Sequence, residues 1–276
     1  MTLEQQLEAF RAAHPPVRLR AARHEWTYVR GGGAGPVVLL LSGALGRAEF
    51  GFGVVAGLED AARVLAPDYP PAGSLDELAD GLAALLDAES AARAHVVGGS
   101  FGGVIAQAFA WRHPGRVASL TLSHTGAPER GAGRGAAVRL LGLLPAGLLR
   151  AMLRRRLRGT LASADPFWAR QFDAMIDTLS KADVISRVRL AAEFGARYGG
   201  VPGPGRPPFP VLTIESDDDP LFPPARRAAL HALYPDAQTH VFTGTGHAAG
   251  ILQPAEYAAI LRRFIEQAER GRSLSS

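Results

Sequence analysis

The stretch Ala94 to Gly103, AHVVGGSFGG, constrains the fold of this chain more than any other. Its first residues, AHVV, predict a short buried strand, and the apolar run Val104 to Ala110 predicts a helix. The chain must therefore change from strand to helix within a few residues, with Ser100 at the tip of the turn. Gly98 and Gly102 lie two residues on either side of this serine, where the missing Cβ allows a very sharp turn.

This turn matches G-x-S-x-G, a pattern in which a serine hydroxyl is lifted above the end of a strand. Such a serine can act as a nucleophile, and the backbone N–H of Phe101 can bind a developing oxyanion. The alternative is an ordinary Gly-rich turn, since the chain contains 32 glycines. A phosphate site is disfavoured because neither G-x-x-x-x-G-K-[ST] nor G-x-G-x-x-G is present. Catalysis therefore requires a base and an acid elsewhere in the chain.

Strand and helix patterns alternate along the chain as in a parallel α/β sheet. The expected strands are residues 17–21, 25–30, 37–41, 63–66, 95–97, 117–122, 211–214 and 239–243. Residues 127–209 contain no convincing strand, and helices are expected there at 136–144, 146–157, 166–180 and 184–198. We expect a core of residues 1–126 and 210–276, interrupted by a helical insertion at 127–209. Ligands of such sheets bind at the carboxyl ends of the strands, where Ser100, the Ser42-Gly43 loop and His124 fall.

A serine nucleophile needs an imidazole to accept its proton and a carboxylate to orient that imidazole. His247 follows the last strand in the Gly-rich loop GTGH and is the expected base. His124 also ends a strand, but it precedes the expected acid and so breaks the chain order of serine, acid and histidine. Within the acidic run DDD, Asp219 is the first choice for the acid and Asp217 the second. A solvated acidic turn is the alternative explanation of this run.

The oxyanion hole and the pocket require further residues. A second N–H donor is expected in the loop after residues 37–41, with Ala44 as the first choice and Leu45 or Gly43 as alternatives. Leu45, His124 and Phe222 are expected to contact the substrate, although a structural role for His124 fits equally well. No metal site is expected, because no metal-ligand spacing is present, and the proposed chemistry needs no cofactor.

Together these features resemble the α/β-hydrolase fold superfamily over about residues 17–269. Three blocks carry the resemblance: the elbow at 98–102, VLTIESDDDPLFPP at 211–224 and GTGHAAGILQPAEYAAILRRFI at 244–265. The resemblance implies a mostly parallel eight-stranded sheet flanked by helices, a helical cap at 127–209, and a triad of Ser100, Asp219 and His247. The family commonly has His-Gly where this chain has Ser42-Gly43. A fainter likeness, in LSHTG and FDAMIDTLSKADVISRVRL, is to the maspardin-type branch, some of whose members are thought to bind ligands without catalysis.

The favoured function is a serine hydrolase that cleaves a small-molecule carboxylic ester or related acyl substrate through an acyl-enzyme. The alternatives are an aminopeptidase, a C–C bond hydrolase or a perhydrolase with the same triad, and a non-catalytic binding protein. An aminopeptidase would need carboxylates in the insertion to hold the substrate amine. The candidates for that role are Glu129, Asp165, Asp173, Asp177, Asp183 and Glu193.

Composition limits the partners and the location. The net charge is +4, and no basic run interleaved with aromatic residues indicates a nucleic-acid partner. There are no cysteines, which excludes thiol chemistry. The polar N-terminus and the lack of a long apolar run predict a cytoplasmic protein without an integral membrane segment. The oligomeric state stays open.

Residues 146–157 combine arginines with leucines at helical spacing and predict a basic amphipathic helix in the insertion. Such a helix could recognise an anionic substrate or make a weak contact with a lipid surface. The simpler interpretation is a solvated arginine face above a packed apolar face.

Overall fold

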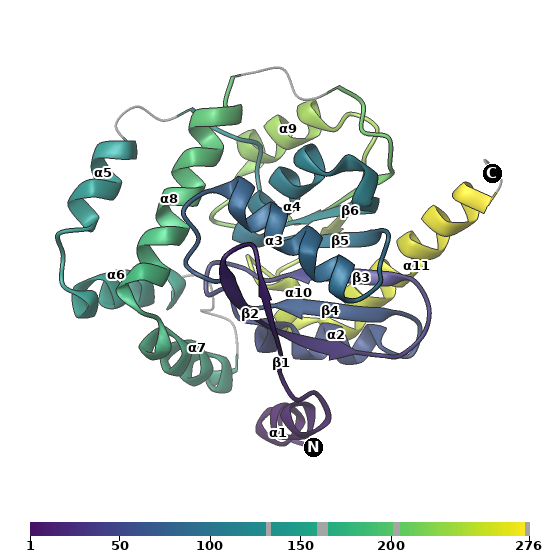
Figure 1. Ribbon diagram of the computed structural model, residues 1–276, viewed down its shortest axis with the longest axis horizontal. Helices are drawn as coiled ribbons and strands as arrows, with labels where there is room; N and C mark the ends of the chain where they lie inside the picture. The colour runs from purple at the N-terminus through teal and green to yellow at the C-terminus, as the bar shows by residue number, and fades with distance from the viewer. Residues whose placement is uncertain (131–133, 159–164, 201–204, 274–276) are drawn as a thin grey trace.

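The computed structural model describes residues 1–130, 134–158, 165–200 and 205–273 of the chain (Figure 1). A single sheet has the strand order β1-β2-β4-β3-β5-β6-β7-β8. The strands are β1 Val17–Ala21, β2 His24–Gly31, β3 Val37–Leu41, β4 Arg63–Pro67, β5 Ala94–Gly99, β6 Val117–Ser123, β7 Val211–Ser216 and β8 Gln238–Phe242. β2 pairs antiparallel with β1 and with β4, whereas all other neighbours are parallel. The expected eight-stranded, mostly parallel sheet is confirmed.

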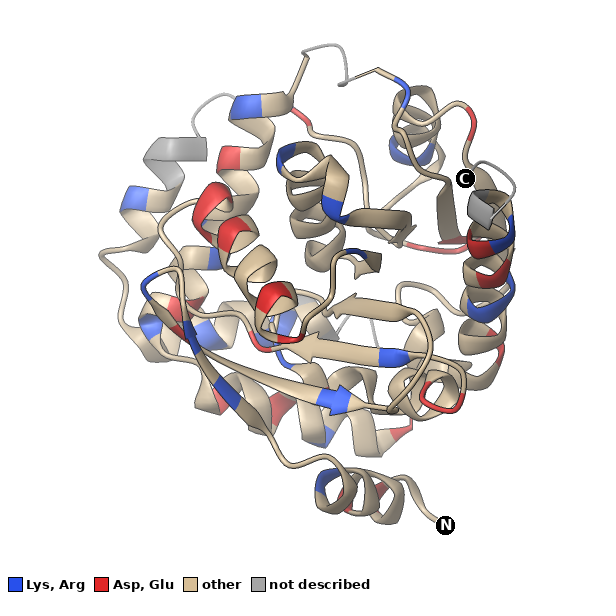
Figure 2. Cartoon of the chain, turned by 45° about the vertical axis from the view of Figure 1, so that its right-hand side comes forward, with Lys and Arg blue, Asp and Glu red and all other residues tan. Residues whose placement is uncertain are grey.

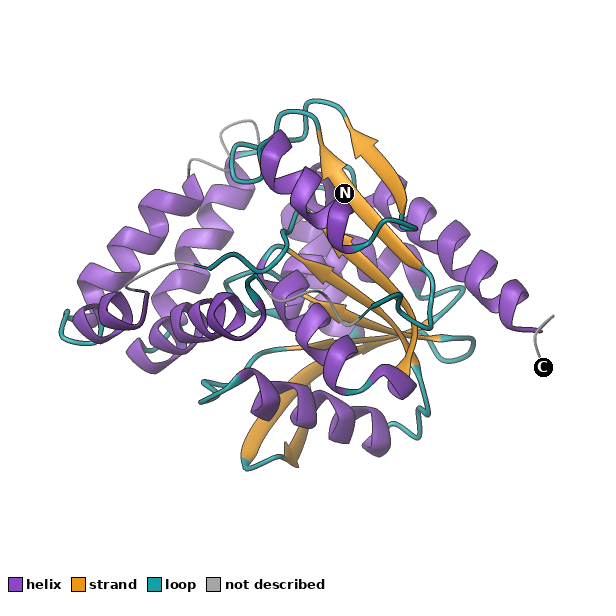
Figure 3. Cartoon of the chain, turned by 90° about the horizontal axis from the view of Figure 1, so that it is seen from above, coloured by secondary structure: helices purple, strands orange, loops and turns teal. Residues whose placement is uncertain are grey.

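Helices cover both faces of the sheet, as the view from above shows (Figure 3). The bounds are α1 Leu3–Ala13, α2 Phe52–Leu58, α3 Leu75–Ala88, α4 Phe101–Arg112, α9 Pro224–Leu233, α10 Ala249–Leu252 and α11 Pro254–Ser273, with short 3-10 turns η1 Ala48–Gly51 and η2 Pro114–Arg116. One apolar cluster joins the sheet to α3, α4 and α9, and a second joins it to α1, α2 and α11. Because both faces are covered, central strands such as β3 and β6 are apolar and almost completely buried.

Four further helices lie between β6 and β7 in the chain: α5 Arg134–Leu141, α6 Ala146–Arg158, α7 Pro166–Thr178 and α8 Lys181–Tyr198. They lie together on the left of Figure 1 and are called the inserted helices below. They share a small apolar cluster with Leu45 of the loop after β3. No strand occurs in the described part of residues 127–209, in agreement with the sequence pattern.

Two helix starts differ from the sequence-based expectation for physical reasons. α8 begins at Lys181 because Ser180 and Asp183 form a reciprocal capping box one turn before the apolar pattern becomes clear. α4 begins at Phe101, immediately after Ser100, although two glycines follow in its first turn. Helix propensity predicts a later start for α4, but close packing requires glycine at these positions.

Candidate active site

Ser100 occupies the sharp turn between β5 and α4. Its backbone angles are φ 53° and ψ −117°, which a non-glycine residue adopts only when the surroundings impose them. The end of β6 supplies that constraint. The N–H of Ser100 donates to the carbonyl of Ser123 at 2.8 Å, and Thr125 Oγ1 donates to the carbonyl of Ser100 at 2.9 Å.

The glycines around Ser100 permit close backbone contacts. A Cβ on Gly102 would lie 2.1 Å from the carbonyl oxygen of Leu41, and one on Gly98 would lie 2.4 Å from the carbonyl oxygen of Gly102. A Cβ on Gly103 would lie 2.5 Å from the side chain of Thr125. The turn after β5 therefore fits against β3 and the end of β6 only if these side chains are absent.

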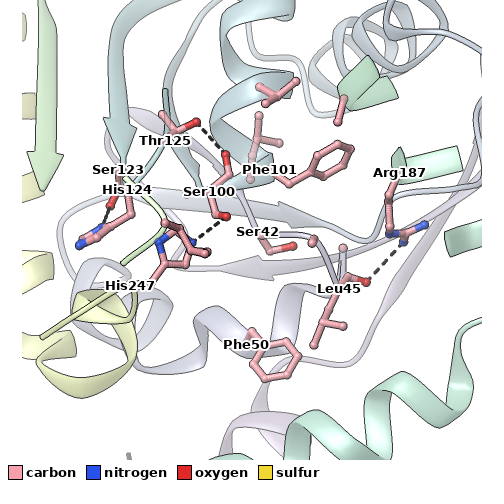
Figure 4. Close-up of a pocket in the computed structure, with 18 of the residues that line it drawn as sticks. Ser42, Leu45, Phe50, Ser100, Phe101, Ser123, His124, Thr125, Arg187 and His247 are labelled. Atoms are coloured by element: carbon pink, nitrogen blue, oxygen red, sulfur yellow. Dashed lines mark hydrogen bonds between the residues drawn. The ribbon is translucent and has the colours of Figure 1, made fainter. Parts of the chain in front are cut away.

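The structure brings the first-choice nucleophile, base and acid together, and Figure 4 shows the serine and the histidine of this group. Ser100 Oγ lies 2.9 Å from His247 Nε2, and His247 Nδ1 lies 2.8 Å from Asp219 Oδ2. The side chain of Asp219 is 1% exposed and that of His247 10% exposed. Ser100 borders the cavity, so the chain of hydrogen bonds runs from a buried carboxylate to a hydroxyl that a ligand can reach. This arrangement can raise the nucleophilicity of a serine hydroxyl.

The acidic run after β7 has a different contact for each aspartate. Asp217 Oδ1 accepts a hydrogen bond from the N–H of Gly244 at 3.1 Å, and Asp218 Oδ1 accepts one from the N–H of Gly246 at 2.8 Å. Asp217, the second-choice acid, thus binds the backbone of the histidine loop and not the imidazole. Only Asp219 reaches His247, and its Oδ1 also accepts from the N–H of Leu221 at 2.8 Å.

The electrostatics of Asp219 favour its ionised form. Burial alone would raise the pKa of this carboxyl. The hydrogen bond and charge of His247, together with the N–H of Leu221, outweigh burial and hold the pKa of Asp219 below its ordinary value. Asp219 is therefore a carboxylate at neutral pH and can stabilise a positive charge on His247.

His124, the rival base, lies edge-on to His247, with ring centroids 5.8 Å apart, and is hydrogen-bonded on both ring nitrogens. Nδ1 lies 2.9 Å from Ser123 Oγ, and Nε2 lies 2.8 Å from Ser216 Oγ. Ser216 Oγ continues to Thr245 Oγ1 at 2.6 Å, in the loop that carries His247. Burial, followed by the charge of His247, lowers the pKa of His124 to about 4, so the ring is neutral at pH 7.

Ser216 and Thr245 were not identified from the sequence. Ordinary serines and threonines at strand ends carry no pattern that distinguishes such a contact from a solvated hydroxyl. The end of β7 and the loop after β8 come together only in the folded sheet, where β7 pairs with β8.

The loop after β3 adjoins Ser100 at the wall of the cavity. Ala44 and Leu45 are the two central residues of a turn closed by the N–H of Gly46 and the carbonyl of Gly43 at 2.9 Å. A Cβ on Gly43 would lie 3.7 Å from Ser100 Cβ, so this loop adjoins the serine. The other expected donor, Phe101, is the first residue of α4. Both proposed oxyanion donors therefore border the same cavity as Ser100.

Ser42, which replaces the usual histidine of the family pattern, is anchored through its backbone. Its carbonyl accepts a hydrogen bond from Tyr69 Oη at 2.7 Å. Its own hydroxyl is buried and has no partner among the described residues. The position of this loop thus depends on Tyr69 rather than on the side chain of residue 42.

A cavity of about 670 Å³ opens beside Ser100, between the carboxyl ends of the strands and the inserted helices. The three residues expected to contact the substrate, Leu45, His124 and Phe222, all border it. Phe222 also stacks on His247, with ring centroids 5.6 Å apart. The inserted helices contribute mainly apolar side chains to the cavity wall: Val138, Leu153, Leu157, Phe172, Val184, Val188 and Phe194. The cavity therefore suits a largely apolar ligand.

Arg187 of α8 is a buried cation in this wall that sequence reasoning did not single out. Its Nη1 donates to the carbonyl of Asp183 at 2.9 Å, and its Nη2 reaches the carbonyls of Tyr69 and Leu45 at 3.3 and 3.4 Å. Its Nε has no partner among the described residues. Burial lowers the pKa of Arg187. Arg187 thus links an inserted helix to the loop after β3.

Most of the carboxylates considered for binding an amine lie away from the cavity. Of the six carboxylates considered for binding an amine, only Glu129 borders the cavity, and it forms an ion pair with Arg226 at 3.0 Å. Within the described ranges, no group of three or more His, Asp or Glu side chains could hold a metal ion. None of the helices in the described parts of the chain combines the length and apolar character that a membrane span requires.

Comparison with known proteins agrees with this architecture. The profile of the Alpha/beta hydrolase family matches residues 37–260. A 2-hydroxy-6-oxononadienedioate/2-hydroxy-6-oxononatrienedioate hydrolase from Cupriavidus pinatubonensis is 30% identical over 242 residues, covering 79% of this chain and 82% of that protein. An uncharacterised protein of Mycobacterium tuberculosis is 26% identical and covers 93% of this chain and 83% of its own length.

Among solved structures, a thermophilic esterase from Thermogutta terrifontis superposes with a TM-score of 0.76 at 21% identity, covering 92% of this chain and 98% of the esterase. At that identity the likeness shows a shared fold and no more. The family match, in contrast, covers most of the chain, including β3 to β8. The chain belongs to the alpha/beta hydrolase family.

Proposed function

We propose that this protein is a serine hydrolase that cleaves a carboxylic ester or related acyl substrate. The observation that carries the proposal is the continuous path of hydrogen bonds from Asp219 through His247 to Ser100, which ends at the wall of an apolar cavity. Two backbone N–H groups, of Phe101 and Ala44, form the proposed oxyanion hole beside it. We also propose that residues 127–209 act as a cap, because inserted helices supply much of the cavity wall.

The reaction proceeds in two halves. Ser100 Oγ attacks the ester carbonyl carbon while its proton passes to His247 Nε2, and the oxyanion is held by the N–H groups of Phe101 and Ala44. His247 then gives the proton to the leaving alkoxide, which departs as an alcohol. In the second half, water gives a proton to His247 and attacks the acyl carbonyl carbon; His247 then returns that proton to Ser100 Oγ as the acyl C–O bond breaks, which releases the acid and free Ser100. Asp219 stabilises the imidazolium in both halves and holds its Nδ1–H in place.

The nucleophile is tested by the variant Ser100→Ala. We expect hydrolysis of a p-nitrophenyl ester to fall by about three orders of magnitude or more. A fluorophosphonate probe should label the folded wild-type protein and not the variant. Ester hydrolysis that persists undiminished in Ser100→Ala would refute the proposal. A folded wild-type protein that the probe does not label would favour a binding protein without catalysis.

A second candidate function is hydrolysis of a C–C bond in a substrate that carries a carboxylate. It is favoured by the buried Arg187 in the cavity wall, whose Nε lacks a partner among the described residues, and by the 30% identity to a hydrolase named for two dioate substrates. Comparing Arg187→Met with wild type tests whether Arg187 binds a substrate carboxylate. If a carboxylate binds there, KM for acidic substrates should rise selectively, whereas equal changes for neutral and acidic substrates would leave only the structural role of Arg187.

A further inference from the structure

Among the described residues, most of the exposed large apolar side chains lie on α5, on α6 or in the turn between these helices. Among the described residues six such side chains are exposed, and four of them lie between Leu140 and Met152. Leu140 is 65% exposed and Leu143 is 80% exposed, while Leu148 and Met152 are each about half exposed. The remaining two are at the N-terminus and in β8. An apolar cluster of this kind marks an interaction surface more often than scattered single residues do.

Exposed arginines lie close to these apolar side chains along the chain. Leu148, Met152 and Arg155 follow one another at spacings of four and three residues, which places them on one stripe of α6. Leu149 lies about 100° further round the helix, where it is buried in the cluster of the inserted helices. On α5, the exposed Arg139 precedes Leu140. We call the following set the docking face: Arg139, Leu140, Leu143, Leu148, Met152 and Arg155.

The charge of this region is one-sided. Residues 130–164 contain eight arginines and no acidic residue, although the net charge of the whole chain is only +4. Part of this charge is used internally, since Arg154 pairs with Asp173 and Asp177 of α7. Arg139 and Arg155 are exposed on the docking face. Along α11, beside the C-terminus in Figure 2, the signs are mixed.

The pairing of exposed leucines with arginines selects among partners. A second copy placed symmetrically would bring two faces of like charge together, which opposes association. A nucleic acid would engage the arginines but offers nothing to the leucines. An anionic bilayer satisfies both, because apolar side chains enter the acyl boundary while arginines contact the headgroups. We propose that the docking face binds the surface of a membrane containing anionic phospholipids.

Docking would also place the cavity near the bilayer. The inward sides of the same two helices border the cavity through Val138, Leu153 and Leu157. An apolar acyl substrate could then pass from the lipid to Ser100 with little exposure to water. This second step rests on the proposed hydrolase function. The docking itself does not, and it can be measured on Ser100→Ala.

Vesicle co-sedimentation tests the docking. Wild type and Ser100→Ala should both partition onto vesicles of mixed phosphatidylcholine and phosphatidylglycerol, less onto pure phosphatidylcholine, and less at high salt. Arg155→Gln should lower the partition coefficient about fivefold, since one arginine near an anionic surface contributes about 1 kcal/mol. Leu143→Ser should lower it about tenfold, from the low end of the free energy of burying a leucine side chain. All variants are first compared by thermal melting, to establish that they are folded.

Matched controls lie away from the docking face. Val241→Ser removes an apolar side chain of β8 that is 47% exposed, and Arg18→Gln removes an exposed arginine from β1. Both should bind as wild type does. The proposal would be overturned if Arg155→Gln and Leu143→Ser bound as well as these controls, or if the wild-type protein did not bind anionic vesicles. Binding that depends on Arg155 but not on Leu143 would indicate a nucleic acid or another purely anionic partner. A dimer that Leu143→Ser dissociates would make the face a self-association surface.

Discussion

The two carboxylate oxygens of Asp219 accept hydrogen bonds from different groups, and replacement of Asp219 by asparagine removes one of these acceptors. Oδ2 accepts from His247 Nδ1 at 2.8 Å, and Oδ1 accepts from the N–H groups of Leu221 and Phe222 at 2.8 and 3.3 Å. If the single oxygen of asparagine stays with the two backbone groups, its NH2 faces His247 Nδ1. The imidazole must then carry its proton on Nε2, where it cannot accept the proton of Ser100.

In the alternative orientation, the asparagine oxygen accepts from His247 Nδ1–H, so Nε2 stays free to accept the proton of Ser100. The asparagine NH2 then faces two backbone N–H groups. Each buried donor without an acceptor costs about 1–3 kcal/mol, so this orientation is about 2–6 kcal/mol less stable. Since about 1.4 kcal/mol is a factor of ten, the productive form is reduced by about 30-fold to about 10⁴-fold. The neutral amide also stabilises the imidazolium less in the transition state. We expect kcat to fall by about three orders of magnitude, with little change in KM because Asp219 does not border the cavity.

The assay is the initial rate of p-nitrophenyl ester hydrolysis by Asp219→Asn, with thermal melting to establish folding. Asp217→Asn is the matched control. Its carboxylate accepts a single hydrogen bond, from the N–H of Gly244, and an asparagine oxygen can accept the same bond. The control should stay within about threefold of wild type. The tautomer argument fails if folded Asp219→Asn keeps more than about a tenth of the wild-type kcat, or if Asp217→Asn loses as much activity.

Two further changes test the surroundings of the site. The pKa of His124 lies below its ordinary value of 6.5, at about 4. Between these two values the unfolded chain binds a proton that the folded chain does not bind. The free energy of unfolding is therefore highest above pH 6.5 and decreases as pH falls toward 4. His124→Asn should remove this contribution of up to about 3 kcal/mol, measured by urea unfolding across that range, and an unchanged pH dependence would contradict the assignment. Gly102→Ala would place a Cβ 2.1 Å from the carbonyl oxygen of Leu41 and should cost about 3 kcal/mol or more. Gly99→Ala, whose Cβ meets no atom within 4 Å, should lower the free energy of unfolding by less than about 1 kcal/mol. Equal urea midpoints for the two alanine variants would show that the contact between residue 102 and the carbonyl oxygen of Leu41 does not determine stability.

The sheet was predictable because burial on both faces leaves a simple pattern. β3 and β6 are continuous apolar runs, and each ends at a Gly- or Ser-bearing loop on the ligand-binding edge. The first two strands were also predictable, since alternation of polar and apolar residues marks an antiparallel pair. α10 was missed because four residues between His247 and Pro254 are too few for a helical period to show.

The surface of the inserted helices was less predictable. Leu148 and Leu149 are adjacent in the chain, and composition alone assigns both to the packed side of a basic amphipathic helix. In the structure they point to different sides, with Leu149 buried and Leu148 about half exposed. The difference depends on where α7 and α8 lie against α6, and a helical pattern within α6 contains no information on its neighbours.

The acidic run and His124 show why chain order and spatial order must be considered separately. β5, β6, β7 and β8 are consecutive neighbours in the sheet, and Ser100, His124, Asp219 and His247 follow them in that same sequence. Chain order excludes His124 as the base, yet the position of β6 between the serine and acid strands forces it close to both. The sheet therefore leaves His124 two acceptable states at this edge, a solvated ring or a neutral ring with satisfied nitrogens. Its bonds to Ser123 and Ser216 provide the second state, which keeps a competing positive charge away from His247.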